Sequence, residues 1–252
     1  MNSKAYLSRI SCDNITLKTD LASLSHIQQQ HLKTIPYENL DIMRGKPLSM
    51  KIDDIYEKII NNQRGGYCFE LNGLYAWLLR SLGFKVRDCM GRWLQGEEGI
   101  PMRRHRVLVV SCDDGDYLCD VGVGRAIPQK PIPMTLNKII EQGKERYKLE
   151  SEPFLGFVLY EWKHNEWQRM YSLTTEEQID VDYVATSFWC ENYPGSYFRS
   201  MNMVHIFTDV GRKAIADREL RIYTPDNVEV IVAATEAIFA ELIEQHFNIK
   251  YQ

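Results

Sequence analysis

The chain has 252 residues, of which 44% are hydrophobic and 25% are charged, and this profile is that of a soluble globular protein. Its formal net charge of -4 gives no electrostatic reason to expect nucleic acid or an anionic membrane surface as a partner. The length exceeds that of one compact core of usual size, so we expect two or three small domains in close contact.

The first third of the sequence reads as helical. Leucine and isoleucine recur at helical spacing over 21–32, directly after Asp20, a residue type that caps helix N-termini. Pro36 cannot continue that helix. A second helix is expected over 52–61, and a third over 68–82, where a glycine follows and ends it.

From residue 84 onward the pattern changes to that of strands. Runs rich in Val, Leu and aromatic residues predict strands at 84–94, 106–111, 117–121, 154–161, 167–171, 201–207 and 228–233. Residues 113–116 (DDGD) supply a hairpin turn, residues 189–198 are expected to form a loop, and residues 236–247 a helix. Helices first, strands next and a mixed end indicate an α+β protein with segregated domains, divided near residues 84 and 190.

The sequence contains no targeting or metal-binding signal. Residues 1–10 lack the charged-then-apolar pattern of a signal peptide, and no run of about 18 apolar residues could span a bilayer. The six cysteines form no CxxC pair and the six histidines no HxxxH pattern, so we expect reduced thiols and no metal. The sequence therefore predicts a cytoplasmic protein without a membrane partner, and it does not indicate an oligomeric state.

Cys68 is the strongest candidate for a catalytic side chain. It follows Gly65 and Gly66 closely and opens the helix expected over 68–82. The unpaired N–H groups of a first helical turn favour a thiolate over a thiol. A catalytic thiolate normally also needs a histidine, which a third group orients. The alternative is that Cys68 is one of six small buried hydrophobic residues.

Two further residues are candidates to complete such a site. His105 begins a predicted strand; its main rival is His205 in a later strand, and a histidine beside two arginines could also lie on the surface. Asp120 lies in an apolar strand, where an unpaired carboxylate is costly. If the hairpin closes at 113–116, Asp120 and His105 share a face, whereas a slip of one residue would separate them. The pattern is therefore compatible with a Cys-His-Asp triad.

Segments that carry these residues occur in one order along nearly the whole chain. They are YLSRI at 6–10, IPYENL at 35–40, RGGYCFELN at 64–72, a histidine followed by Val107 and Leu108, DVGVG at 120–124, and PGSYF at 194–198. In this order they resemble the arylamine N-acetyltransferase family, and the run at 64–72 is the most specific match.

The resemblance implies an α+β fold of three parts. An N-terminal helical bundle over 1–84 would carry the cysteine, a central β-barrel over 85–189 the histidine and the aspartate, and a short C-terminal α/β lid would span 190–252. Glu38 and Arg64 resemble a pair of opposite charges with which the family holds the loop before the cysteine.

The resemblance also implies an activity. Cys68 would be the nucleophile, His105 its proton partner and Asp120 the group that fixes the imidazole, in a triad arranged as in cysteine proteases. In the implied ping-pong reaction, Cys68 takes the acetyl group of acetyl-CoA, and an arylamine or a hydrazine then takes it from the sulfur. The implied partners are a CoA thioester donor and a small-molecule amine or hydrazine acceptor, with no metal.

The same resemblance places further residues around the two substrates. The CoA side would be formed by Trp93, Arg104, Gly124, Ser196 and Phe198, and the acceptor pocket by Tyr37, Phe69 and Val123. The family usually has Phe where Tyr37 stands and an aromatic residue where Val123 stands, so a smaller and more polar pocket is expected. The basic run Arg103, Arg104 and Arg106 is expected either to be solvated or to attract a phosphate-bearing ligand, and Arg104 is the candidate for a CoA phosphate.

Three other interpretations use the same residues. A cysteine hydrolase or a transglutaminase-like enzyme would use the same triad, with water or a protein amine as the attacking group. A macrolactam-forming amide synthase would need a large open acceptor cleft. A non-catalytic binding protein would keep the fold without turnover, although all three triad positions are filled.

Overall fold

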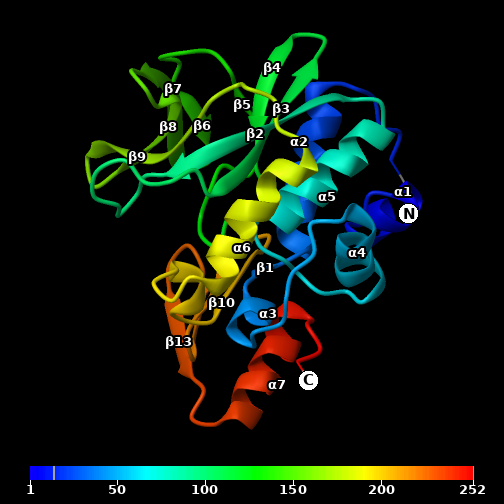
Figure 1. Ribbon diagram of the computed structural model, residues 1–252, viewed down its shortest axis with the longest axis vertical. Coiled ribbons are helices and arrows are strands. Elements are labelled where there is room, and N and C mark those ends of the chain that lie inside the picture. The colour runs from blue at the N-terminus through cyan, green and yellow to red at the C-terminus, as the bar shows by residue number, and fades with distance from the viewer. Residues whose placement is uncertain (14, 252) are drawn as a thin grey trace.

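The structure is a computed structural model that describes residues 1–13 and 15–251. Its N-terminal third is helical (Figure 1). The helices are α1 (Ser3–Arg9), α2 (Leu21–Thr34), α3 (Leu40–Met43), α4 (Ile52–Tyr56) and α5 (Cys68–Ser81), and α4 continues into a π-helical turn, Glu57–Asn61. The side chain of Asp20 accepts a hydrogen bond from the backbone N–H of Ser23 and caps α2, as its place in the sequence predicts.

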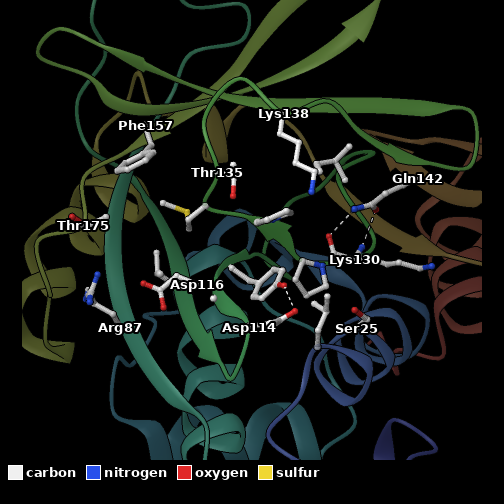
Figure 2. Close-up of a pocket in the computed structure, with 18 of the residues that line it drawn as sticks. Ser25, Arg87, Asp114, Asp116, Lys130, Thr135, Lys138, Gln142, Phe157 and Thr175 are labelled. Atoms are coloured by element: carbon white, nitrogen blue, oxygen red, sulfur yellow. Dashed lines mark hydrogen bonds between the residues drawn. The ribbon is translucent and has the colours of Figure 1, made fainter.

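An eight-stranded antiparallel sheet forms the middle of the chain. Its strands lie in the order β5 (Ile132–Pro133), β4 (Gly115–Cys119), β3 (His105–Cys112), β2 (Lys85–Trp93), β9 (Glu166–Leu173), β8 (Gly156–Lys163), β7 (Glu145–Glu152) and β6 (Ile140–Gln142). The end strands approach each other, because the side-chain amide of Gln142 accepts from the backbone N–H of Lys130 at 3.0 Å and donates to its carbonyl at 2.9 Å (Figure 2). The sheet is therefore a nearly closed barrel.

A second antiparallel sheet combines both ends of the chain. Its order is β1 (Tyr37–Glu38), β10 (Met203–Phe207), β11 (Arg212–Ala216), β12 (Glu219–Tyr223) and β13 (Val228–Val232). Helix α7 (Glu236–Phe247) shares an apolar core with this sheet and lies at the end of the molecule away from the barrel (Figure 1). Because β1 comes from the helical third, the C-terminal sheet is joined to the part of the chain that carries Cys68.

Helix α5 lies at the centre of the fold. From Cys68 to Leu79 every side chain except Trp77 is buried, because α1 and α4 contact the helix as well as the barrel strands β2 and β3. Gly73 leaves room for a barrel side chain, since a Cβ atom there would lie 2.6 Å from Nη1 of Arg106. This packing presses the helix that begins at Cys68 against the strand that begins at His105.

The predicted mixture of helices and antiparallel strands is confirmed, with local corrections. The helix over 236–247 is confirmed to the residue. The predicted loop at 189–198 is wrong in its first part, because α6 (Val184–Asn192) extends into it and buries Ser187 and Cys190. Short 3-10 turns, Asp180–Tyr183 and Tyr197–Arg199, lie on either side of α6. Strands β1, β5, β6, β7, β11 and β12 were not predicted.

Candidate active site

The loop before Cys68 is shaped by two glycines. A Cβ atom at Gly65 would lie 2.1 Å from the carbonyl oxygen of Pro36, and one at Gly66 would lie 2.9 Å from the carboxylate of Glu70. The loop can lie against its neighbours only because neither position has a side chain. Cys68 follows as the first residue of α5 and is buried, so its thiol lies where helix N–H groups favour a negative charge.

A cluster of buried opposite charges supports this loop. The predicted pair is present: Nη2 of Arg64 lies 2.7 Å from Glu38, and it also contacts Asp41 at 3.1 Å. Lys58, which the sequence analysis missed, contacts Asp41 at 2.8 Å and Glu70 at 2.9 Å. Burial lowers the pKa of Lys58, but the three carboxylates outweigh burial and hold this pKa above its usual value. The cluster fixes the chain that leads to the candidate nucleophile.

His105 and Asp120 form a buried pair at one end of the barrel. Nε2 of His105 lies 2.7 Å from Oδ2 of Asp120. Oδ1 of Asp120 accepts hydrogen bonds from the side-chain amide of Asn72 and from the backbone N–H of Gly122, both at 2.8 Å. Burial lowers the pKa of His105, but the charge and the hydrogen bond of Asp120 outweigh burial and raise this pKa to about 10. The carboxylate therefore stabilises the protonated imidazole.

Cys68 and His105 are close neighbours, since both line one cleft and each affects the pKa of the other. The sulfur of Cys68 lies 3.8 Å from the backbone carbonyl oxygen of Arg104, the residue before His105. The approach depends on Gly122, where a Cβ atom would lie 2.7 Å from the Cα of Cys68. Burial raises the pKa of the Cys68 thiol, whereas the hydrogen bond and the charge of His105 act to lower it. A thiol next to an imidazolium that a carboxylate stabilises is an arrangement that activates a cysteine nucleophile. The structure thus brings together the three residues that the sequence singled out.

Cys68 and His105 line a cleft of about 580 Å³ between the barrel and the five-stranded sheet. Six residues that the sequence analysis assigned to substrates also line it: Tyr37, Trp93, Arg104, Val123, Gly124 and Phe198. The basic side chains Arg104, Arg125, Lys163 and Arg212 lie around it, and Glu97 is the acidic residue of the lining. This balance of charge suits a ligand with negative groups.

Two of the residues assigned to substrates lie outside the lining of the cleft. Phe69 has no exposed surface, and its ring contacts those of Tyr67 and Tyr183 at centroid distances of 5.3 and 5.5 Å. Ser196 is buried, and its hydroxyl donates to the backbone carbonyl of Cys190 at 2.7 Å. Phe69 therefore packs in the core, and the hydroxyl of Ser196 is bonded to the backbone, so neither side chain faces the cleft.

The basic run at 103–106 is not one solvated patch. Arg104 lines the cleft and contacts the carboxylate of Glu97. Arg106 is 2% exposed, and its Nε donates to Asp88 at 2.7 Å. The expectation of a surface run fails at Arg106 because β3 is buried on both faces, so the strand turns this side chain into the protein.

Asn72 joins the helix to the aspartate, and the sequence analysis did not assign it a role. Its amide also donates to the backbone carbonyl of Arg106 at 2.6 Å, and its side-chain oxygen accepts from the N–H of Val121 at 2.9 Å. Asn72 lies four residues after Cys68 and therefore on the same face of α5. That spacing is the signal in the sequence that points to it.

A larger cavity, of about 910 Å³, opens at the other end of the barrel (Figure 2). Its acidic residues at the β3–β4 turn already have partners: Asp114 accepts from the hydroxyl of Tyr117 at 2.8 Å, and Asp116 from that of Ser111 at 2.6 Å. None of the described residues that line it is a cysteine or a histidine. This cavity therefore offers no thiol–imidazole pair.

Metal ligation and membrane insertion have no visible basis in the described part of the chain. Within residues 1–13 and 15–251, no group of three or more His, Cys, Asp or Glu side chains is arranged to hold a metal ion. In the same ranges, the helices are too short or too polar to cross a membrane.

The family model described as N-acetyltransferase matches residues 20–252. The chain is 32% identical to an arylamine N-acetyltransferase of Mycolicibacterium smegmatis, over 99% of this chain and 92% of that protein. It is 30% identical to an arylamine N-acetyltransferase / N-hydroxyarylamine O-acetyltransferase of Salmonella typhimurium, over 97% of this chain and 88% of the relative. The solved arylamine N-acetyltransferase of S. typhimurium superimposes with a TM-score of 0.93 at 28% identity, over 99% of this chain and 92% of that one. The Mycobacterium marinum enzyme, solved in complex with CoA, gives 0.89 at 30% identity, over 99% and 93%. The chain therefore belongs to the arylamine N-acetyltransferase family.

Proposed function

We propose that the protein transfers the acetyl group of acetyl-CoA to arylamines or hydrazines through an acetyl-Cys68 intermediate. The observation that carries the proposal is the hydrogen-bonded pair of His105 and Asp120 next to the buried thiol of Cys68, beside a cleft of about 580 Å³. The names of the relatives and the CoA complex of the M. marinum enzyme support a CoA thioester as the donor.

In the first half-reaction, the sulfur of Cys68 attacks the carbonyl carbon of the thioester, and the bond from that carbon to the sulfur of CoA breaks. The imidazolium of His105 supplies the proton that the departing CoA thiolate takes up. One thioester replaces another, so the free energy changes little and the protein mainly lowers the barrier. A positioned acid–base group contributes roughly 100- to 10,000-fold to such a step.

In the second half-reaction, the amine nitrogen attacks the acetyl carbon, and Cys68 leaves as a thiolate. His105 takes up the proton that the nitrogen loses as the amide forms. Arylamines are weakly basic and largely unprotonated at neutral pH, so their lone pair needs no dedicated base. Asp120 orients the imidazole in both half-reactions, which completes a triad arranged as in cysteine proteases.

The two substrates share the cleft in turn. We assign the donor side to Trp93, Arg104, Gly124 and Phe198, where basic side chains can meet the phosphates of CoA, and the acceptor side to Tyr37 and Val123. The guanidinium of Arg104 would exchange its contact with Glu97 for a phosphate. We also propose that the acceptor pocket is smaller and more polar than is usual in the family, because Tyr37 and Val123 stand where aromatic residues are usual.

The three parts of the chain divide this work. The bundle over 1–84 presents the nucleophile, the barrel over 85–189 presents the imidazole and the carboxylate, and the part over 190–252 covers the cleft as a lid. The pairing of β1 with β10 ties the lid to the bundle. All six cysteines are free thiols, which fits the reducing cytoplasm, where we place the activity.

Intact-protein mass spectrometry after mixing with acetyl-CoA tests the proposal. We expect one acetyl group on the wild type, none on Cys68→Ala, and loss of the group when an arylamine or a hydrazine is added. An enzyme that forms no adduct and releases no CoA in the presence of these amines would contradict acetyl transfer. An adduct lost equally fast without any amine would indicate a hydrolase.

A further inference from the structure

Two polar side chains that line the cleft lie next to each other. Tyr37 on β1 and His205 on β10 are directly paired across the two strands and both line the cleft. Side chains of directly paired residues project from the same face of a sheet, about 5 Å apart at Cβ. The triad uses neither residue.

Tyr37 lies close to the nucleophile. Its ring occupies the space in front of Gly124, where a Cβ atom would come within 2.5 Å of it. Two residues earlier, Gly122 touches the backbone of Cys68 in the same way. Burial raises the pKa of Tyr37, and the charge of Cys68 raises it further, so the phenol stays protonated and can both donate and accept a hydrogen bond.

His205 is buried, and its Nε2 has no hydrogen-bond partner among the described residues. Burial, followed by the charges of Arg212 and Arg125, lowers the pKa of His205 to about 3, so the imidazole is neutral at physiological pH. A neutral imidazole has one donor and one acceptor nitrogen. A buried polar atom without a partner destabilises the protein, and a ligand that supplies the partner removes this cost.

The lining of the cleft also includes the apolar side chains of Val123, Phe198, Met201 and Met203, besides Arg125 and Arg212. We propose that Tyr37 and His205 form a hydrogen-bonding subsite that selects amine acceptors carrying a hydroxyl or carbonyl substituent on the ring. The inference rests on the proposed acetyl transfer. It concerns the acceptor because the amine nitrogen must reach the acetyl carbon on Cys68, and Tyr37 lies close to that residue. The amide groups in the pantetheine arm of CoA can form the same hydrogen bonds, so the experiment must separate binding of the acceptor from binding of CoA.

The test compares matched acceptors on matched variants. 4-Aminophenol and 4-methylaniline have the same shape, but only the first has a hydrogen-bonding substituent. In Tyr37→Phe and in His205→Leu, we expect kcat/KM for 4-aminophenol relative to 4-methylaniline to fall roughly 5- to 10-fold, the worth of one neutral hydrogen bond. Tyr193→Phe is the control, because Tyr193 is half exposed and stacks on Trp189 outside the cleft. Its ratio should equal that of the wild type.

A second measurement separates acceptor from donor. If the subsite binds the acceptor, Tyr37→Phe and His205→Leu should lower the acceptor ratio more than they lower the rate at which acetyl-CoA forms the acetyl-enzyme. If that rate falls while the acceptor ratio stays constant, the subsite binds the CoA arm and the acceptor assignment is wrong. If neither the kcat/KM ratio of the two acceptors nor the rate of acetyl-enzyme formation changes, the proposed subsite is wrong. Acetylation of the wild type, measured in the same experiment, shows independently whether the proposed acetyl transfer holds.

Discussion

The two ends of the β3–β4 hairpin share their strands but differ in chemistry. At one end, His105 and Asp120 are buried, and both carboxylate oxygens are hydrogen-bonded. At the other end, Asp114 in the turn and Asp116 at the start of β4 are exposed beside the cavity of about 910 Å³. The larger cavity thus lies away from the groups that can activate a nucleophile.

For this reason we base the candidate site on convergent buried polar groups rather than on cavity volume. A buried charge costs several kcal/mol unless it is paired and hydrogen-bonded. The end with the triad meets this requirement through the amide of Asn72, the N–H of Gly122 and the imidazole of His105. The turn at the other end has no such requirement, because water can reach its carboxylates.

Asp120→Asn should have the largest effect, because an amide cannot stabilise the imidazolium of His105. We expect the rate of arylamine acetylation to fall roughly 10³- to 10⁴-fold, with circular dichroism unchanged. The matched substitution Asp116→Asn, at the other end of the same strand, should leave the rate within about twofold, since it touches only a surface hydrogen bond. If both variants lose a comparable fraction of the acetylation rate, the proposed difference between the two ends of the hairpin is wrong.

Asn72→Ala tests the support of the triad rather than its members. The substitution removes one hydrogen bond each from the carboxylate of Asp120, the N–H of Val121 and the carbonyl of Arg106, and Asp120 keeps those from Gly122 and His105. We expect a loss of about 3 kcal/mol in the free energy of unfolding and a fall of roughly 10- to 100-fold in kcat, because the imidazole is less well held.

Urea unfolding and steady-state kinetics measure both effects. Asn192→Ala is the control, because the amide of Asn192 is exposed and bonds only to the carbonyl of Phe188. It should change stability by less than about 1 kcal/mol and leave kcat as it is. If Asn72→Ala lowers stability but keeps full activity, Asn72 stabilises the core and does not position the imidazole.

Local signals in the sequence explain which elements could be predicted. Helix α7 has a threonine cap and regularly spaced apolar residues, so its bounds follow from the sequence alone. Strand β7 could not be predicted, because only Tyr147 and Leu149 face inward and the remaining side chains of ERYKLESE are mostly charged. In α6, Phe188 is exposed while its neighbours pack inward, so the apolar residues do not mark one face.

The same contrast applies to the site. Cys68, His105 and Asp120 could be singled out because each stands in a distinctive local run of residues. Lys58 could not, since a lysine on a helix is usually solvated and its contacts with Asp41 and Glu70 arise only when three segments pack together. Arg106 was expected to be solvated or to attract a phosphate, because its carboxylate partners Asp88 and Asp180 come from elsewhere in the chain.

The raised pKa of His105 makes the triad end sensitive to pH. Its folded-state pKa of about 10 lies above the ordinary value of 6.5, so the stabilisation is complete below pH 6.5 and is lost as the pH rises towards 10. We expect the free energy of unfolding to fall by at most about 1.4 kcal/mol per pH unit above neutral pH. Denaturant titrations of the wild type and Asp120→Asn measure this, and the variant should give the flatter profile. Equal slopes would assign the pH dependence to other groups.

Gln142→Ala probes the opposite end and should have the smallest effect. The substitution removes both hydrogen bonds that link β6 to Lys130, but the two residues are not buried, so water replaces most of what is lost. We expect the free energy of unfolding to fall by about 1 kcal/mol and the acetylation rate to stay constant. Hydrogen exchange should quicken at the amides of β5 and β6 while those of β3 beside His105 remain protected. Gln168→Ala, which removes only a surface contact with Glu166, should leave both strands as they are. If opening the barrel in Gln142→Ala also slows acetyl transfer, the two ends are coupled, and the barrel cannot be divided into a reactive end and a supporting end.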